Sequence, residues 1–155
     1  MLPISMELTI FLSQLVSTLF MVGLIWIVQV VHYPLFNGVG ESNFVEYQRR
    51  HQRNITMVVG LVMLIELFSA LLMIYYPLEG VPMRLIFLSL GSVLLIWIST
   101  AMVQIPCHAR LEKGFDRQAY SRLVGTNWLR TIVWTLRGGL VVWMLILLLA
   151  NPTGS

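Results

Sequence analysis

Residues 127–139 read NWLRTIVWTLRGG, and they open a run of about 24 mostly apolar residues, which is long enough to cross a bilayer. This run carries two arginines, Arg130 and Arg137. At about 100° per residue, both arginines share one helical stripe with Asn127 and Trp134. A charged side chain near the membrane centre costs about 2.5 to 3.5 kcal/mol, so it normally faces a partner, a polar cavity or water. The stripe therefore predicts a polar complement on other helices.

The composition of the whole chain is that of an integral membrane protein. Of its 155 residues, 57% are hydrophobic and 11% are charged, and the mean hydropathy is +0.81. The connections between apolar segments are short and include no linker that would mark a second domain. We therefore predict a single all-α membrane domain over residues 1–155, folded as a four-helix bundle. The four predicted spans are about residues 8–31, 54–76, 85–105 and 127–150.

The basic residues predict the orientation of the bundle. The connections after the first and third spans hold seven of them, whereas the opposite side holds one. Under the positive-inside rule, this bias predicts a multi-pass protein of a cell (inner) membrane, with those two connections in the cytoplasm and both termini outside. A pI near 9.4 then reflects contact with anionic membrane lipids and gives no case for nucleic acid. The seven residues are Arg49, Arg50, Arg53, Arg110, Lys113, Arg117 and Arg122, and the one is Arg84.

One acidic residue, Glu66, lies inside a predicted span. It should lie about 18 Å deeper than Asn54, and Arg137 about 15 Å deeper than Asn127, at the helical rise of 1.5 Å per residue. The two charges reach similar depths, so we predict that they pair or share a water-filled pocket. Ionisable groups at depth are costly enough to make a functional site the default, and a purely structural pair is the alternative.

Three residues are expected to interrupt the helices. Pro34 and Pro106 should end or distort the first and third spans, because proline cannot donate a backbone hydrogen bond. Gly125 should break the helix before the fourth span.

The two halves of the chain share a weak sequence repeat. Its order favours a parallel duplication of a two-helix unit, as in parallel transporter repeats, and chance similarity is the alternative. The first half reads Gln29, Pro34, Phe44, Tyr47 and Asn54, and the second reads Gln104, Pro106, Phe115, Tyr120 and Asn127.

All three histidines come from different predicted helices and fall near one level, at the cytoplasmic ends of the spans. They are His32, His51 and His108. Neutral imidazoles bind zinc, copper and iron, and two opposed histidines can hold a haem, so this level predicts a metal or haem site. The alternative is that these histidines bind headgroups, cap helix carbonyls or hydrogen-bond one another. The one cysteine, Cys107, excludes an intramolecular disulfide.

The stretch Pro106-Cys-His-Ala-Arg-Leu111, followed by Asn127-Trp-Leu-Arg-Thr131, resembles the second half of small four-helix membrane proteins related to anthrone oxygenases. The His32-Tyr-Pro34 stretch and the segment from Tyr47 to Glu66 are similar to a bacterial branch of such proteins. The resemblance implies the oxidation of a lipophilic substrate.

Two hypotheses follow. In the first, the chain is a membrane oxidoreductase or oxygenase with a cytoplasm-facing polar pocket, in which the histidines bind a metal or transfer protons and the arginines stabilise an anionic enolate or quinone-like oxygen. In the second, it is a non-catalytic subunit or lipid-binding module of a membrane complex, whose polar stripe fixes helix packing. Metal analysis and an absorption spectrum would discriminate between them. The candidate catalytic residues are Glu66, Asn127, Arg130 and Arg137, and the candidate metal ligands are His32, His51 and His108.

Overall fold

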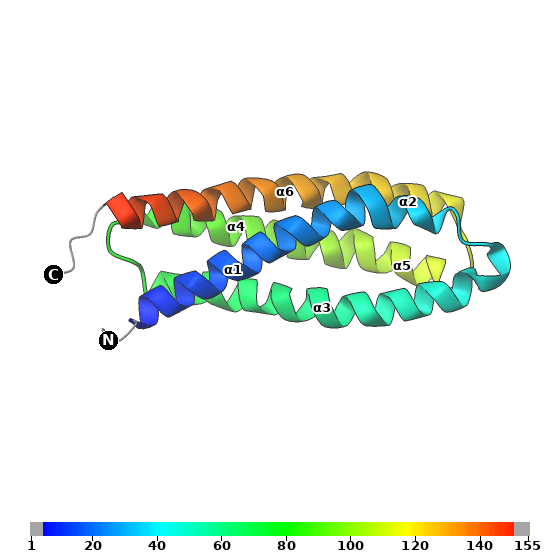
Figure 1. Ribbon diagram of the computed structural model, residues 1–155, viewed down its shortest axis with the longest axis horizontal. Coiled ribbons are helices and arrows are strands. Elements are labelled where there is room, and N and C mark those ends of the chain that lie inside the picture. The colour runs from blue at the N-terminus through cyan, green and yellow to red at the C-terminus, as the bar shows by residue number, and fades with distance from the viewer. Residues whose placement is uncertain (1–4, 151–155) are drawn as a thin grey trace.

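The computed structural model describes residues 5–150, and over these residues the chain is a bundle of long helices without a β-strand (Figure 1). This confirms the predicted all-α, four-helix membrane bundle. The elements in chain order are α1 (Met6–Ile27), η1 (Val28–His32), α2 (Tyr33–Phe36), α3 (Glu41–Tyr75), α4 (Met83–Ser99), η2 (Thr100–Gln104), α5 (Ile105–Leu111) and α6 (Arg117–Ala150).

Four helical stretches are long and apolar enough to span a membrane, as predicted. Each of them is longer than the predicted span, because the helix continues into amphipathic turns that hydropathy alone does not include. The stretches are Met6–Phe36, Ser42–Tyr75, Met83–Leu111 and Arg117–Ala150.

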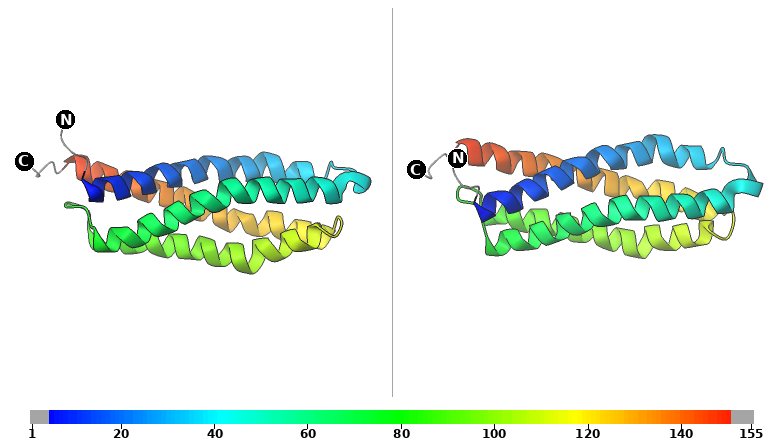
Figure 2. Two further views of the ribbon diagram at one scale, coloured as in Figure 1. Left: turned by 90° about the horizontal axis from the view of Figure 1, so that it is seen from below. Right: turned by 60° about the horizontal axis from the view of Figure 1, so that its bottom comes forward.

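The four stretches pack in a ring, since α1 and α4 each contact both α3 and α6. Figure 1 and Figure 2 show the start of α1 and the end of α6 at the same end of the bundle. We call the opposite end, which holds the connections 37–40 and 112–116, the loop end. The histidines and most of the basic residues lie toward this end.

Buried side chains fill the loop end. Phe36 and Phe44 at the α2–α3 connection have no exposed surface, and neither do Leu111 and Leu123 at the α5–α6 connection. The ring of Phe44 also contacts Phe115 edge to face, with 5.1 Å between centroids. These residues form the loop-end cluster, which closes the bundle where α2, α3, α5 and α6 meet.

The two prolines distort the helices, which is one of the two outcomes expected, and they do not end them. Pro34 and Pro106 lie in the first turns of α2 and α5, directly after the π-helices η1 and η2. A proline ring clashes with the carbonyl four residues earlier, and a wider π-turn displaces that carbonyl. The backbone N–H of the residue directly before each proline reaches back five residues, from Tyr33 to Val28 and from Ile105 to Thr100. The chain therefore stays helical through both prolines.

The helix α6 also runs without interruption through Gly125 to Ala150, so the predicted break there is wrong. An interior glycine costs a helix only about 1 kcal/mol relative to alanine, and burial of neighbouring residues such as Leu123 outweighs this cost. The start of α6 is fixed by Asp116, whose Oδ1 accepts from the backbone N–H groups of Gln118 (2.8 Å) and Ala119 (3.0 Å).

The element order repeats between the halves: a long helix, a π-helix, a short helix with proline, and a second long helix. In both halves the proline comes six residues after the first residue of the π-helix, Val28 or Thr100. In this register Gln104, the fifth residue of η2, corresponds to His32, the fifth residue of η1. Gln29 is the second residue of η1 and so does not correspond to Gln104. The repeat is thus one of architecture, and the glutamine match read from the sequence is not structurally equivalent.

Candidate functional site

A cavity of about 300 Å³ lies between α3 on one side and α4, η2 and α5 on the other, and it reaches inward to α1 and α6. Most of its wall is apolar, including Ile25, Val59 and Met63. Its polar residues are concentrated toward the loop end. Those toward the loop end are Tyr33, His51, Gln52, Gln104, His108 and Arg130, and the cavity is also lined by Thr56, Trp97 and Thr100.

The structure brings the three histidines together. Nε2 of His32 and Nδ1 of His51 share a hydrogen bond of 2.8 Å, and the rings of His51 and His108 lie 5.9 Å apart between centroids. His108 is further held by Gln48, whose Nε2 is 2.9 Å from its Nδ1, and by Tyr33, whose hydroxyl is 3.5 Å from its Nε2. Two of these histidines, His51 and His108, line the cavity.

This arrangement does not support the predicted metal or haem site. Within residues 5–150, no group of three or more His, Cys, Asp or Glu side chains is placed to hold a metal ion. Nε2 of His32, Nδ1 of His51 and both ring nitrogens of His108 instead face other side chains, which fits the alternative that the histidines hydrogen-bond one another. The rings of His32 and His51 also pack against the buried Phe36, each 5.1 Å away between centroids.

Arg130 is the cation on the cavity wall, and only 6% of its surface is exposed. Its Nη1 donates to Oδ1 of Asn127 at 3.1 Å, and its guanidinium carbon lies 4.9 Å from the ring centroid of Trp134. Among residues 5–150 no carboxylate pairs with it, and its Nε has no acceptor. Arg130 therefore places a positive charge without a carboxylate counter-ion beside a mostly apolar cavity, and the side chains that contact it, Asn127, Trp134 and Tyr33, are neutral.

Three other buried polar atoms at the cavity also lack a partner in the described structure. They are Nε1 of Trp97, Oε1 of Gln52 and Oε1 of Gln104. Buried polar atoms are normally hydrogen-bonded, so a cluster of unpaired ones around one cavity is typical of a ligand site. Together with Nε of Arg130 they offer two donors and two acceptors to a bound molecule.

Asn127 positions Arg130 and does not itself line the cavity. Its Nδ2 donates to Oε1 of Gln29 at 2.7 Å, while Nε2 of Gln29 donates to the carbonyl of Val124 at 3.3 Å. This chain of hydrogen bonds connects η1 to α6 and leaves the Asn127 carbonyl oxygen Oδ1 available to Arg130.

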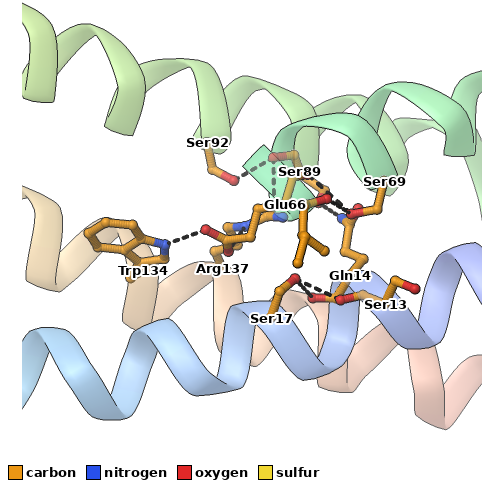
Figure 3. A network of polar contacts seen from close by, with 10 residues as sticks. Ser13, Gln14, Ser17, Glu66, Ser69, Ser89, Ser92, Trp134 and Arg137 are labelled. Carbon is orange, nitrogen blue, oxygen red and sulfur yellow. Dashed lines mark hydrogen bonds and ion pairs between the residues drawn. The ribbon is translucent and has the colours of Figure 1, made fainter. Parts of the chain in front are cut away.

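The predicted pairing of Glu66 and Arg137 is confirmed, with Nε of Arg137 3.3 Å from Oε1 of Glu66 and both side chains buried. Figure 3 shows the network around the pair. Trp134 donates to the other carboxylate oxygen at 3.0 Å, and Nη1 of Arg137 donates to the carbonyl (2.9 Å) and the hydroxyl (2.8 Å) of Ser89. Gln14 donates to the same hydroxyl at 2.5 Å. The network therefore connects α1, α3, α4 and α6.

The four candidate catalytic residues thus belong to two groups. Arg130, with Asn127 behind it, faces the cavity, whereas Glu66 and Arg137 do not line it. Trp134 lies between the groups, because its ring packs against Arg130 and its N–H binds Glu66. The sequence placed both arginines on one helical stripe. It carried no information on the cavity, which Arg130 lines and Arg137 does not.

Two further site residues, Gln48 and Gln52, were not predicted. Both stand within one helical turn of His51 on α3, with Gln48 bonded to His108 and Gln52 on the cavity wall. The signal in the sequence is their spacing: Gln48 and Gln52 are four residues apart, with His51 between them, just before an apolar span.

A scan against protein-family models finds no family that matches the chain, and searches of curated proteins and of solved structures find no match. Fold and composition define the class: a multi-pass, four-helix integral membrane protein. What it does has to be argued from the cavity and its polar residues.

Proposed function

We propose that this membrane protein is an enzyme that takes a lipophilic substrate into the cavity, removes a proton from it and stabilises the resulting oxyanion. The observation that carries the proposal is Arg130, a buried cation on the cavity wall that has no carboxylate partner among residues 5–150. A buried charge without a counter-ion is costly, and an anionic ligand would supply that counter-ion.

The histidines supply a proton acceptor. His51 lines the cavity, and its Nδ1 is engaged with His32, which is half-buried at the bundle surface. When Nδ1 of His51 carries the proton of this bond, its Nε2 is free to accept a proton from the substrate. His51 can then pass its Nδ1 proton to His32, so that the charge need not stay beside Arg130.

Oxidoreductase chemistry is the further part of this proposal, and it rests on the resemblance to proteins related to anthrone oxygenases. Stabilising a substrate anion is a suitable first step for such chemistry, because the anion gives up electrons more readily than the neutral molecule. A metal or haem would have to displace hydrogen bonds that the histidines make to one another and to Gln48.

A second function, a lipid-binding module of a membrane complex, is favoured by one observation. The ring nitrogens of His108 already face Gln48 and Tyr33, so this histidine has a structural role whether or not chemistry occurs. In that case the cavity would bind its ligand without changing the ligand's protonation.

Titration of the purified protein with 2-naphthol separates these functions, because the ionised form absorbs at longer wavelength than the neutral form. The wild type should bind 2-naphthol and ionise it at a lower pH than detergent alone does. Arg130→Met should abolish this change in ionisation, and Arg130→Lys should restore part of it. Arg84→Met, at an exposed position outside the cavity, is the matched control.

Binding without any change in ionisation would favour the lipid-binding module. No binding of 2-naphthol, or the same ionisation in the Arg130→Met variant as in the wild type, would contradict the proposed function.

A further inference from the structure

The ends of the cavity are closed along the bundle axis. The loop-end cluster of Phe36, Phe44, Leu111 and Leu123 is fully buried and does not line the cavity. A cytoplasm-facing mouth at this end, as predicted from the sequence, therefore has no support. Toward the other end, the interior is filled by Trp134 and by the Glu66–Arg137 network.

The side of the cavity between α3 and η2–α5 is not closed in the same way. Three cavity-lining residues have exposed side chains: Thr56 and Leu64 on α3 and Ile105 at the start of α5. Leu64 is 41% and Ile105 55% exposed. These positions lie within two of the stretches that are long and apolar enough to span a membrane, so we expect them to face lipid.

Gly60 contributes to this side opening. It lines the cavity, and a Cβ atom added to it would meet only Cγ2 of Thr56, at 4.0 Å. Gly60 lies one helical turn after Thr56 on α3, so the two positions leave a stretch of small residues at the edge of the cavity.

We propose that the ligand is a single-chain amphiphile with a carboxylate head, which enters from the bilayer between α3 and η2–α5. The head binds at Arg130, where Nε and the Trp97 N–H are donors without acceptors, and the chain extends past Gly60 into the lipid. The head arrives from the bilayer as the neutral carboxylic acid, His51 accepts its proton, and Arg130 stabilises the carboxylate that results. The inference therefore rests on the proposed function and deepens it by naming the substrate class.

The size and charge of the site favour this class. At about 300 Å³, the cavity is at the small end of ligand pockets, which take up roughly 300 to 1,000 Å³. It admits a head and the first part of one chain, and the side opening lets the rest of the chain stay in the bilayer. A carboxylate neutralises Arg130 and matches its planar guanidinium, whereas an ester of the same chain does not carry the required charge.

Photolabelling of the full-length protein in lipid nanodiscs tests the proposal. The probe is palmitic acid with a diazirine at mid-chain, and its methyl ester serves as the uncharged counterpart. The wild type should be labelled by the acid on α3 and on η2–α5. Labelling by the ester should be weaker by about tenfold, since it lacks the charge that Arg130 binds.

Gly60→Phe should reduce labelling by the acid by about tenfold, because its ring occupies the side opening. Gly91→Phe on α4 is the matched control: this glycine is exposed, also inside a span, and a Cβ there meets nothing within 4 Å. It should leave labelling unchanged. Thr56→Trp blocks the same edge from an exposed position and replaces Gly60→Phe if that variant does not fold.

Equal labelling by acid and ester, or undiminished labelling in a folded Gly60→Phe or Thr56→Trp variant, would overturn the inference. If palmitic acid fails to label while 2-naphthol still binds and depends on Arg130, the lateral chain-bearing ligand is wrong and the proposed function stands. If neither probe binds, the proposed function itself is wrong.

Discussion

Trp134 shows how much one residue can organise inside a membrane bundle. Its ring packs under the Arg130 guanidinium, and its N–H binds Glu66, so it contacts both polar groups at once. From the sequence, Trp134 was one member of a polar stripe, and its burial among Met21, Met63 and Ile96 could not be read from spacing. The stripe itself was predictable: the helical period shows which residues share a face, and the cost of a buried charge shows that this face turns away from lipid.

Glu66 and Arg137 belong to the part of the site that the sequence did predict. Glu66→Gln and Arg137→Met should each lower the stability of the protein in detergent, at a typical cost of about 3 to 5 kcal/mol for an unpaired buried charge. The double variant should recover much of this loss. Denaturant or thermal unfolding of the four proteins measures the coupling between the two positions.

The pair also forms hydrogen bonds with Trp134 and Ser89, and a variant that removes one of these bonds serves as the control. Trp134→Phe keeps one aromatic ring but removes the N–H to Glu66 and part of a fully buried side chain, so it should cost at least the roughly 1.5 to 3 kcal/mol of a hydrogen bond to a charged group. Additive losses in the double variant Glu66→Gln/Arg137→Met would show that the two charges are stabilised independently.

His51 should be required for proton transfer and less so for binding. In His51→Asn the cavity keeps Arg130, so 2-naphthol should still bind within a few-fold of the wild-type affinity, while its ionised fraction falls toward that in detergent. Absorption at the wavelength of the ionised form, measured at saturating protein, checks this. An undiminished ionised fraction would remove His51 from the proposed mechanism and leave Arg130 alone responsible.

At the scale of the elements, Gly138 allows α1 and α6 to approach each other closely. A Cβ at this buried position would lie 2.9 Å from Cγ2 of Val22, whereas one at the neighbouring Gly139 would meet nothing within 4 Å. Small residues at such crossings let helix backbones approach closely in membranes.

Gly138→Leu should therefore destabilise the bundle by about 1 to 3 kcal/mol, the usual cost of overpacking. Gly139→Leu should be neutral or should stabilise α6 slightly, because leucine is a better helix former than glycine. Thermal unfolding of both variants in one detergent makes the comparison. Equal effects of the two substitutions would show that the α1–α6 contact is looser than the structure has it.

The spans were predictable from hydropathy, and the π-helices were not. Pro34 and Pro106 were expected to end or distort the helices, because a proline in a regular α-helix removes a hydrogen bond and clashes. The structure accommodates both by one wider turn each, in which the backbone N–H before the proline reaches back five residues. Gly125 was misread because tertiary packing outweighs a small local preference.

For the whole molecule, helix length and charge together bear on orientation. The helix α3 has 35 residues and α6 has 34, so each is about 50 Å long, against about 30 Å for the hydrocarbon core. The excess of α3 lies at the loop end, where Arg49, Arg50 and Arg53 follow one another within little more than one turn. We infer that this end is cytoplasmic.

A reporter fused after Ser155 should accordingly be active outside the cytoplasm. In a variant whose Cys107 is replaced by Ala, a single cysteine introduced at Lys113 should be protected from impermeant thiol reagents in intact cells and react after permeabilisation. Labelling in intact cells, together with an inactive reporter, would reverse the orientation.

The paired π-helices have an evolutionary consequence. A π-helix of this kind holds one residue more than the α-helix it interrupts, so its gain or loss is an insertion or deletion within a helix. Divergent homologues that have straightened either bend should lack one residue within 28–32 or 100–104, inside an apolar helix where an alignment gap is least expected. The same single deletion would turn every residue that precedes it by about 100° relative to the rest of its helix. Such homologues would share their ancestry with this chain, but different side chains would line their cavity.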